Sequence, residues 1–170
     1  MGKRAGAKNK GRGIQVVVVF RLRQEEFGVE IGPVLEISPM LAITRIPHAP
    51  HFIEGVIELR GQVIAVINLA RQFGLAEQKG LPKTARIVVV RIAQETLGLI
   101  VDEAPEVLWI AEEHIEPTPE IIQTKVKRDY ITGVAKLGER LIILLNLNNV
   151  LAAEEIDKVE EIKTSVEREA

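Results

Sequence analysis

The fold is decided by Phe52–Gly74, which reads FIEGVIELRGQVIAVINLARQFG. Two apolar segments with a period of two, at 55–60 and 62–68, flank a central Arg-Gly pair, and this pattern predicts a strand, a tight turn and a second strand. The second strand is apolar on both faces, so we expect both faces to be covered. Gly61 can adopt a backbone conformation closed to most residues, and Arg60 beside it carries a planar fork of donors suited to carboxylates.

On either side of this stretch, the sequence predicts short strands rich in Val and Ile, separated by Pro and Gly. We expect strands at 15–23, 27–31, 43–46, 55–60, 62–68, 85–93, 95–102, 104–109, 130–136 and 139–145. Spacing this short favours an all-β protein of barrels or a sandwich over β-α-β units. The chain is expected to pass between two halves at Gln72 to Pro82 and around Pro117 and Pro119.

Composition agrees with a globular protein, since 170 residues with 46% apolar content can bury a core. The ends differ in charge: residues 1–12 carry five basic side chains and no acid, and residues 152–170 carry seven acids against three bases. We interpret 1–13 as a disordered basic tail. We interpret 153–170 as a surface helix or tail, because its apolar residues form a narrow stripe. That stripe consists of Ile156, Val159 and Ile162.

The chain has no cysteine, which excludes disulfides, a thiolate nucleophile and Cys-based zinc sites. This is compatible with a reducing compartment, and we expect a cytoplasmic location. No segment is long enough to span a bilayer, so direct membrane insertion is not expected.

Four stretches carry a family resemblance: IPHAPHFIEGVIELRGQVIAVINLARQFG, the upstream VVVVFRLRQEEFGVEIGPVLEI, and the downstream LGLIVDEAPEVL and YITGVAKLGERLIILLNLNNVL. Together they resemble the CheW-type chemotaxis coupling proteins over roughly residues 15–152. The chain departs from the family pattern at Ala65, where Pro is usual, and at Asn68 and Asn146, where Asp is common.

The resemblance implies two small five-stranded, SH3-like β-barrel subdomains in one compact CheW-like domain at 14–152, with a groove between them. A C-terminal helix follows. The Leu-Arg-Gly pattern of residues 59–61 has no second copy in the chain, so any pseudo-symmetry is expected in the structure rather than in the residues.

The resemblance also implies a function: an adaptor that couples methyl-accepting chemoreceptors to the histidine kinase CheA, recruited to membrane receptor arrays. The alternative is a scaffold of the same fold in a non-chemotactic histidine kinase pathway. By motif, the candidate groove for the receptor's cytoplasmic tip consists of Val34, Glu36, Ile37, Arg60, Gly98, Val101 and Asp102. The candidate surface for the CheA regulatory domain consists of Ile43, Pro47, Val56, Gly61 and Val63.

Two roles remain open for Arg60. It pairs with a carboxylate across the groove as a structural element, or it contacts the receptor directly. A structural role predicts that Arg60→Ala lowers the melting temperature, and a contact role predicts weaker receptor binding at nearly unchanged stability.

Other classes of function find little support in the residues. His48 and His51 have a spacing that can bind metal, but two prolines interleave with them, and we interpret the segment as a solvated loop. Asp102 and Glu103 are adjacent, so in a strand they point to opposite faces; we expect one buried Asp and one solvated Glu. Six aromatic residues are too few for nucleic-acid stacking platforms. We therefore expect no enzyme activity, no cofactor, no metal and no nucleic-acid partner.

Overall fold

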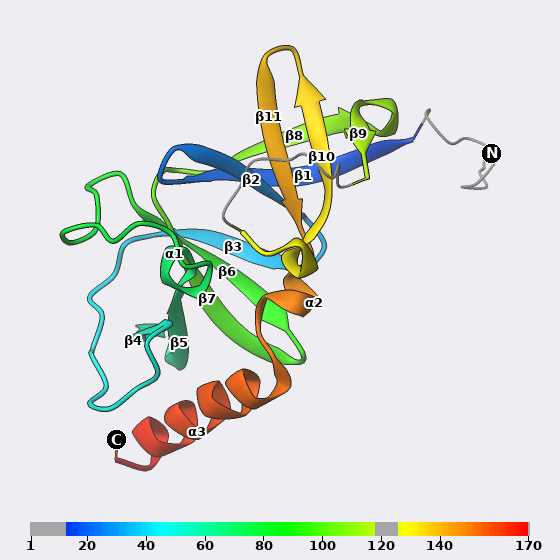
Figure 1. Cartoon of the computed structure of the whole chain (residues 1–170). Helices are drawn as coiled ribbons and strands as arrows, with labels where there is room; N and C mark the ends of the chain where they lie inside the picture. The colour runs from blue at the N-terminus through cyan, green and yellow to red at the C-terminus, as the bar shows by residue number, and fades with distance from the viewer. Residues whose placement is uncertain (1–12, 118–125, 170) are drawn as a thin grey trace.

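The computed structural model describes residues 13–117 and 126–169, which form two β-sheets and a C-terminal helix (Figure 1). The five-stranded sheet has the spatial order β3 (Val34–Pro39), β6 (Arg86–Ile92), β7 (Glu95–Val101), β5 (Gln62–Asn68) and β4 (Ile53–Leu59). The six-stranded sheet has the order β8 (Glu106–Ala111), β1 (Ile14–Leu22), β2 (Glu25–Glu30), β11 (Arg140–Leu145), β10 (Ile131–Leu137) and β9 (Ile115–Glu116). The all-β prediction is confirmed, with the two-residue β9 as an additional strand.

One predicted strand is wrong, and two real strands, β3 and the two-residue β9, were not predicted. Residues 43–46 form only an isolated bridge, between Thr44 and Val56. Of the two strands that were not predicted, β3 is the longer. It is an edge strand with a bulge between Val34 and Glu36, so its apolar alternation is broken.

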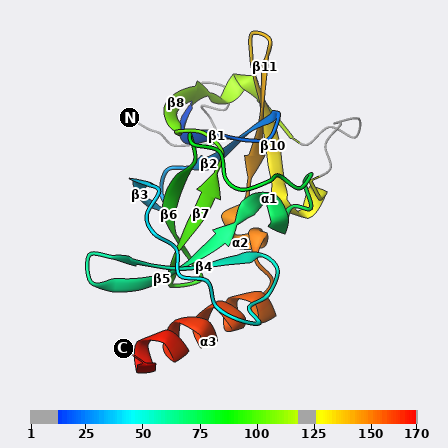
Figure 2. The same ribbon diagram turned by 90° about the vertical axis from the view of Figure 1, so that its left-hand side faces the viewer.

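The chain passes between the sheets at two other places than predicted. It crosses at 31–33, from β2 to β3, and at 102–105, from β7 to β8. Residues 73–85 instead lead back into the five-stranded sheet, and Pro117 follows β9 within the six-stranded sheet. Pro119 lies outside the described residues. Figure 2 shows the resulting arrangement, with the five-stranded sheet between the six-stranded sheet and the C-terminal helix.

The two sheets repeat one plan. In each, an antiparallel hairpin (β4–β5 or β10–β11) joins the rest of the sheet through a parallel pair, β5 with β7 and β11 with β2. Both hairpins have a register shift at their first residues. The repeat is also present in the residues, at an offset of 78 positions, which corrects the expectation from sequence. Identical pairs are Ile53 and Ile131, Gly55 and Gly133, Val56 and Val134, Leu59 and Leu137, Ile64 and Ile142, Asn68 and Asn146, and Leu69 and Leu147.

Three apolar clusters form the core, and the strand period of two assigns each side chain to a cluster. The largest, which we call the inter-sheet cluster, takes residues from both sheets, including Val18, Phe20, Val88, Val90 and Leu99. The other two clusters each belong to one sheet. In β5, Ala65 and Ile67 face the inter-sheet cluster while Ile64 and Val66 face the other side, so the prediction that both faces are covered is confirmed.

Short helices follow both repeated hairpins, and a long one ends the described chain. The helices that follow the hairpins are α1 (Leu69–Gln72) and α2 (Leu147–Val150), and the long one is α3 (Ala153–Glu169). Two 3₁₀ helices lie elsewhere, η2 (Glu112–His114) after β8 and η3 (Arg128–Tyr130) before β10. In α3, Val159 is buried and Ile156 and Ile162 pack against the inter-sheet cluster, as the apolar stripe predicts. Within 13–117 and 126–169, no helix combines the length and apolar character needed to cross a membrane.

Candidate functional site

Three residues predicted to line the receptor groove lie together on β3, at an edge of the five-stranded sheet. Val34 is half-buried against the inter-sheet cluster, and Ile37 is 40% exposed. The Glu36 carboxylate accepts a hydrogen bond from the Arg60 guanidinium and forms an ion pair with it. Because β3 and β4 are opposite edges of this sheet, the pair joins one edge to the turn at the other.

Arg60 occupies the β4–β5 turn with a left-handed backbone, at φ 53°, and Gly61 follows at φ 77°. Its side chain is 74% exposed, while that of Glu36 is 27% exposed. An ion pair this accessible contributes little to stability, on the order of 0–1 kcal/mol. Most of the Arg60 fork therefore remains accessible to a partner.

The other three residues predicted for this groove are buried. Val101 belongs to the inter-sheet cluster and is fully buried. Gly98 lies under Ile87, where an added Cβ would come within 2.7 Å of the Ile87 Cγ2 atom, so the glycine permits close packing. Asp102 is also buried, and its carboxylate forms a 3.0 Å ion pair with Arg23. Gly98 and Val101 therefore offer no surface to a partner, and the carboxylate of Asp102, whose side chain is 11% exposed, is already paired with Arg23.

Sequence reasoning missed two exposed apolar residues on β8: Val107, 48% exposed, and Trp109, 76% exposed. Val107 lies opposite Val18 in the register, and Val18 belongs to the inter-sheet cluster. Trp109 is two residues further along β8, so Val107 and Trp109 are both on the sheet face that looks toward this cluster. Their alternation with the more buried Leu108 and Ile110 was the available signal in the sequence.

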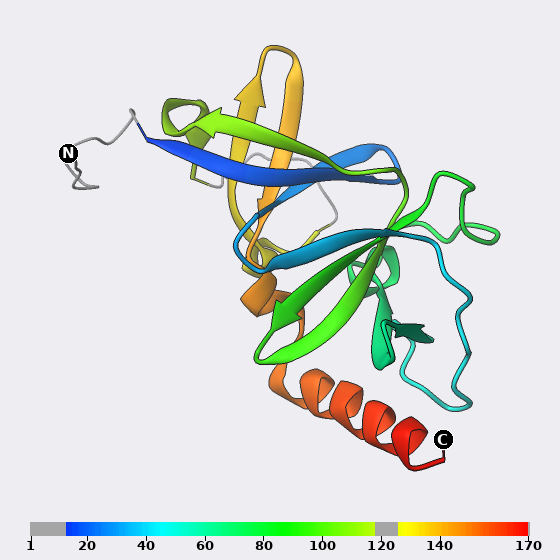
Figure 3. The same ribbon diagram turned by 180° about the vertical axis from the view of Figure 1, so that it is seen from behind.

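Ile37 lies on the matching face of the other sheet, because its partner in the register, Val88, belongs to the same cluster. In Figures 1 and 3, β3 runs below β1 and β8. We call Ile37, Val107 and Trp109 the β3–β8 surface. It takes one edge strand from each sheet and three of the large apolar side chains that are exposed within the described residues. A patch in which such side chains adjoin is typical of an interaction site.

The residues predicted for the kinase surface gather around β4 and the β4–β5 turn. Pro47 and Gly61 are exposed, Ile43 and Val63 are half-buried, and Val56 is buried. The backbone of Val56 exchanges two hydrogen bonds with Thr44, of 2.8 and 2.9 Å. All five predicted residues therefore belong to the five-stranded sheet or to the loop that covers its β4 edge.

A buried carboxylate, Glu54, holds that loop. A strict period of two would set Glu54 on the face opposite Ile53 and Ile57, but its side chain is only 4% exposed because the bulge at the start of β4 turns it inward. It forms ion pairs with Arg45, at 2.9 Å, and with Arg71, at 3.4 Å, and accepts a 3.0 Å hydrogen bond from the Asn68 side-chain amide. Arg45 comes from the loop, so the network fastens the loop to the sheet.

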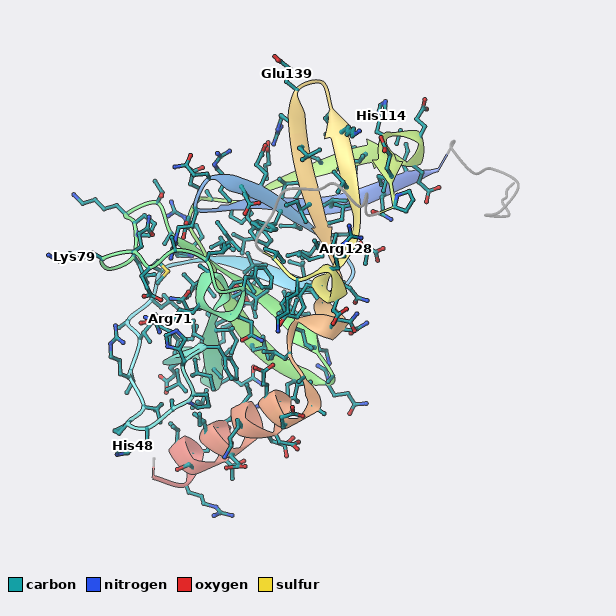
Figure 4. The ribbon with its side chains drawn as sticks, viewed as in Figure 1. His48, Arg71, Lys79, His114, Arg128 and Glu139 are labelled. Atoms are coloured by element: carbon teal, nitrogen blue, oxygen red, sulfur yellow. The ribbon has the colours of Figure 1, made fainter. Side chains whose placement is uncertain are left out.

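The histidines do not converge. Figure 4 shows His48 on the loop before β4 and His114 at the far end of the six-stranded sheet. His51 Nε2 lies 3.9 Å from a Glu77 carboxylate oxygen, and both side chains are exposed. Within the described part of the chain, no group of three His, Cys, Asp or Glu residues is placed to hold a metal ion.

Comparisons with known proteins agree with this architecture. The family model of the CheW-like domain matches residues 16–155. The chemotaxis protein CheW of Klebsiella aerogenes is 35% identical over 153 residues, 89% of this chain and 90% of that protein. The CheW of Treponema pallidum is 30% identical over 84% of this chain and 85% of its own.

A solved structure extends the comparison to three dimensions. The crystal structure of the scaffolding protein TtCheW from Thermoanaerobacter tengcongensis has a TM-score of 0.75 and 38% identity, covering 84% of this chain and 96% of that one. The fold, the family model and these relatives lead to one conclusion. The chain belongs to the CheW-like domain family.

Proposed function

We propose that this protein is a chemotaxis adaptor that couples chemoreceptors to a CheA-type histidine kinase in the cytoplasm, at membrane receptor arrays. The observation that carries the proposal is that the two candidate surfaces draw on different strands. The β3–β8 surface takes strands from both sheets, whereas the surface around β4 belongs to one sheet alone. A protein with two distinct surfaces can hold two partners at once.

The β3–β8 surface suits the tip of a receptor, which is a helical hairpin. A helix binds by laying an apolar face against an apolar surface with polar anchors at its border. Ile37, Val107 and Trp109 supply the apolar contacts, and Arg60 with Glu36 supplies charge beside β3. This supports the receptor as the partner on this side.

The surface around β4 suits a kinase regulatory domain. An edge strand offers backbone groups and apolar side chains for pairing between domains. Pro47, Gly61 and Val63 are accessible there. A patch of about 800 Å² per partner is typical of specific complexes and would allow reversible assembly.

The test is a pair of binding titrations, against a receptor cytoplasmic fragment and against a kinase regulatory domain from the same source. Ile37→Glu and Val107→Glu should each weaken receptor binding about tenfold or more, since each places a charge in an apolar contact, and leave kinase binding unchanged. Val63→Glu should do the reverse.

Leu141→Glu is the matched control, because Leu141 is 45% exposed but lies at the β10–β11 hairpin, away from both surfaces. It should bind both partners like the wild type. If neither partner binds the wild-type protein, the adaptor function is wrong. If Ile37→Glu and Val107→Glu bind the receptor normally, the receptor lies elsewhere on the molecule.

A further inference from the structure

Arg23 is an arginine with an unusual backbone and an unusual number of partners. It lies at the turn of the β1–β2 hairpin in the six-stranded sheet, with φ 60°, a conformation that a residue other than glycine rarely adopts. Its side chain is only 19% exposed. Such a conformation at an arginine is worth explaining, because strain is retained where the side chain is needed.

All the side-chain partners of Arg23 come from other segments. Its Nη1 donates to Asp102 Oδ2 at 3.0 Å and to Gln78 Oε1 at 3.0 Å, and its Nε donates to the Ala76 carbonyl at 2.7 Å. The backbone N–H of Arg23 also donates to Asp102 Oδ2, at 2.6 Å. Ala76 and Gln78 belong to the loop between α1 and β6, in the five-stranded half.

Asp102 is itself held on both sides. It follows β7 directly, at the point where the chain crosses to the six-stranded sheet. Its backbone N–H donates to the Arg21 carbonyl at 2.9 Å, and its carbonyl accepts a 2.5 Å hydrogen bond from the Thr84 hydroxyl. One guanidinium thus joins a hairpin of one sheet, a loop of the other and the crossover between them. We call Arg23, Ala76, Gln78 and Asp102 the clasp.

We propose that Arg23 is a positioning residue that fixes the orientation of the two sheets and thereby shapes the β3–β8 surface. The proposal rests on the function proposed above. The β3–β8 surface takes one strand from each sheet, so its geometry depends on the angle between them. The surface around β4 draws all of its residues from the five-stranded half, so a change in that angle should alter it less.

This difference gives a readout that simple loss of stability would not produce. If only about a tenth of the molecules keep the competent orientation without the clasp, the apparent receptor affinity falls about tenfold, although no residue that touches the receptor has changed. Kinase binding should stay within about twofold of the wild type. Arg23→Lys should recover only part of the loss, because an ammonium group cannot reach three acceptors with a fixed fork.

The binding experiment compares wild type, Arg23→Ala and Arg23→Lys against the receptor fragment and the kinase regulatory domain. Arg21→Ala is the control, since Arg21 lies on the same hairpin and its ion pair with Glu103 is long, 3.7 Å, and exposed. Selective loss of receptor binding in Arg23→Ala supports the clasp. Unchanged receptor binding overturns it, and so does an equal loss for both partners, which would indicate general destabilisation.

A second measurement does not depend on any partner. Because the chain has no cysteine, spin labels can be attached at Glu58→Cys in β4 of the five-stranded sheet and at Glu139→Cys in the β10–β11 turn of the six-stranded sheet. The distance distribution between the labels should be narrow in the wild type and broad or shifted in Arg23→Ala. An unchanged distribution overturns the clasp even if the receptor binds, and a broadened one supports it even if the adaptor function fails.

Discussion

The hairpins β4–β5 and β10–β11 follow one plan and differ at their turns. In β10–β11 the first turn residue is Gly138, at φ 61°, where glycine has no steric penalty. In β4–β5 the equivalent position is Arg60, at φ 53°. A side chain in the left-handed region costs about 1 kcal/mol. The β4–β5 hairpin therefore carries a conformational penalty that the β10–β11 hairpin avoids, at a residue whose side chain is mostly exposed.

The same two units differ behind the turn, at their equivalent asparagines. Asn68 and Asn146 each cap the short helix that follows, by accepting a backbone N–H at 3.1 and 3.0 Å. Asn68 also donates to the buried carboxylate of Glu54, whereas the residue equivalent to Glu54 is Thr132. Asn146 thus caps a helix, whereas Asn68 caps a helix and also takes part in a buried charge network.

The largest expected effect comes from placing Asp at these two positions. Asn68→Asp should lower the free energy of unfolding by about 2 kcal/mol, because it removes a donor and sets two carboxylates against each other in a buried site. Asn146→Asp should be neutral or slightly stabilising, since Asp is a good helix cap. Urea unfolding of both variants measures the difference. Equal effects would mean that the two caps are equivalent after all.

The next largest effect concerns the first residue of the second strand in each hairpin, which is Arg140 in β11 and Gln62 in β5. Arg140 donates to Glu26 and to Glu106, both at 2.6 Å, and so links β11 to β2 and β8. We expect Arg140→Ala to lower the free energy of unfolding by about 1–2 kcal/mol, a value reduced for the 41% exposure of the arginine side chain. Gln62→Ala should change it by less than about 0.5 kcal/mol.

Acid should remove this difference. The hydrogen bond from Arg140 lowers the pKa of Glu26 from its ordinary value of 4.5, although burial opposes the shift. A carboxyl group with a lowered pKa stabilises the fold above its unfolded-state pKa, and this contribution disappears as the pH falls through the folded-state value. The gap between wild type and Arg140→Ala should therefore be constant near neutral pH and narrow below about 4.5. A gap that persists at pH 2 would assign the loss to packing.

The smallest effect on stability belongs to the turn itself. Arg60→Gly, which copies the other hairpin, loses an exposed ion pair but relieves the left-handed side chain, so the free energy of unfolding should change by less than about 0.5 kcal/mol. Gly138→Ala should lower it by about 1 kcal/mol. Receptor titration of Arg60→Gly then decides between the two roles of Arg60. Weaker binding at unchanged stability indicates a contact, and a large loss of stability indicates a structural role.

Much of the fold was readable from the sequence where the period of two was intact, as in 62–68. The prediction from this period failed at β3, because a bulged edge strand that is half-exposed lacks alternation. Glu54 departs from the period for a related reason: the bulge at the start of β4 and the covering loop bury a charge that the period would expose. Arg23 gave no signal, because its partners are 53 to 79 residues away and only the folded chain brings them together.

For the candidate site, the motif identified β3 and the β4–β5 turn but also included side chains that lie in the core. Gly98 and Val101 are required for packing under the surface rather than on it. Trp109 was visible as an alternating residue, but its exposure depends on β8 being the edge of the six-stranded sheet. Edge position is a property of topology, which a local pattern does not contain.

The order of strands along the chain has a consequence for synthesis. The five-stranded sheet is made from one continuous stretch, β3 to β7, whereas the six-stranded sheet is assembled from pieces on either side of it. Glu26 and Arg140, which meet across β2 and β11, are 114 residues apart. Long-range pairing of this kind is slow, because loop closure precedes the contacts that stabilise it. During synthesis on the ribosome, the five-stranded sheet can therefore form before the β10–β11 hairpin, which β2 pairs with, has emerged.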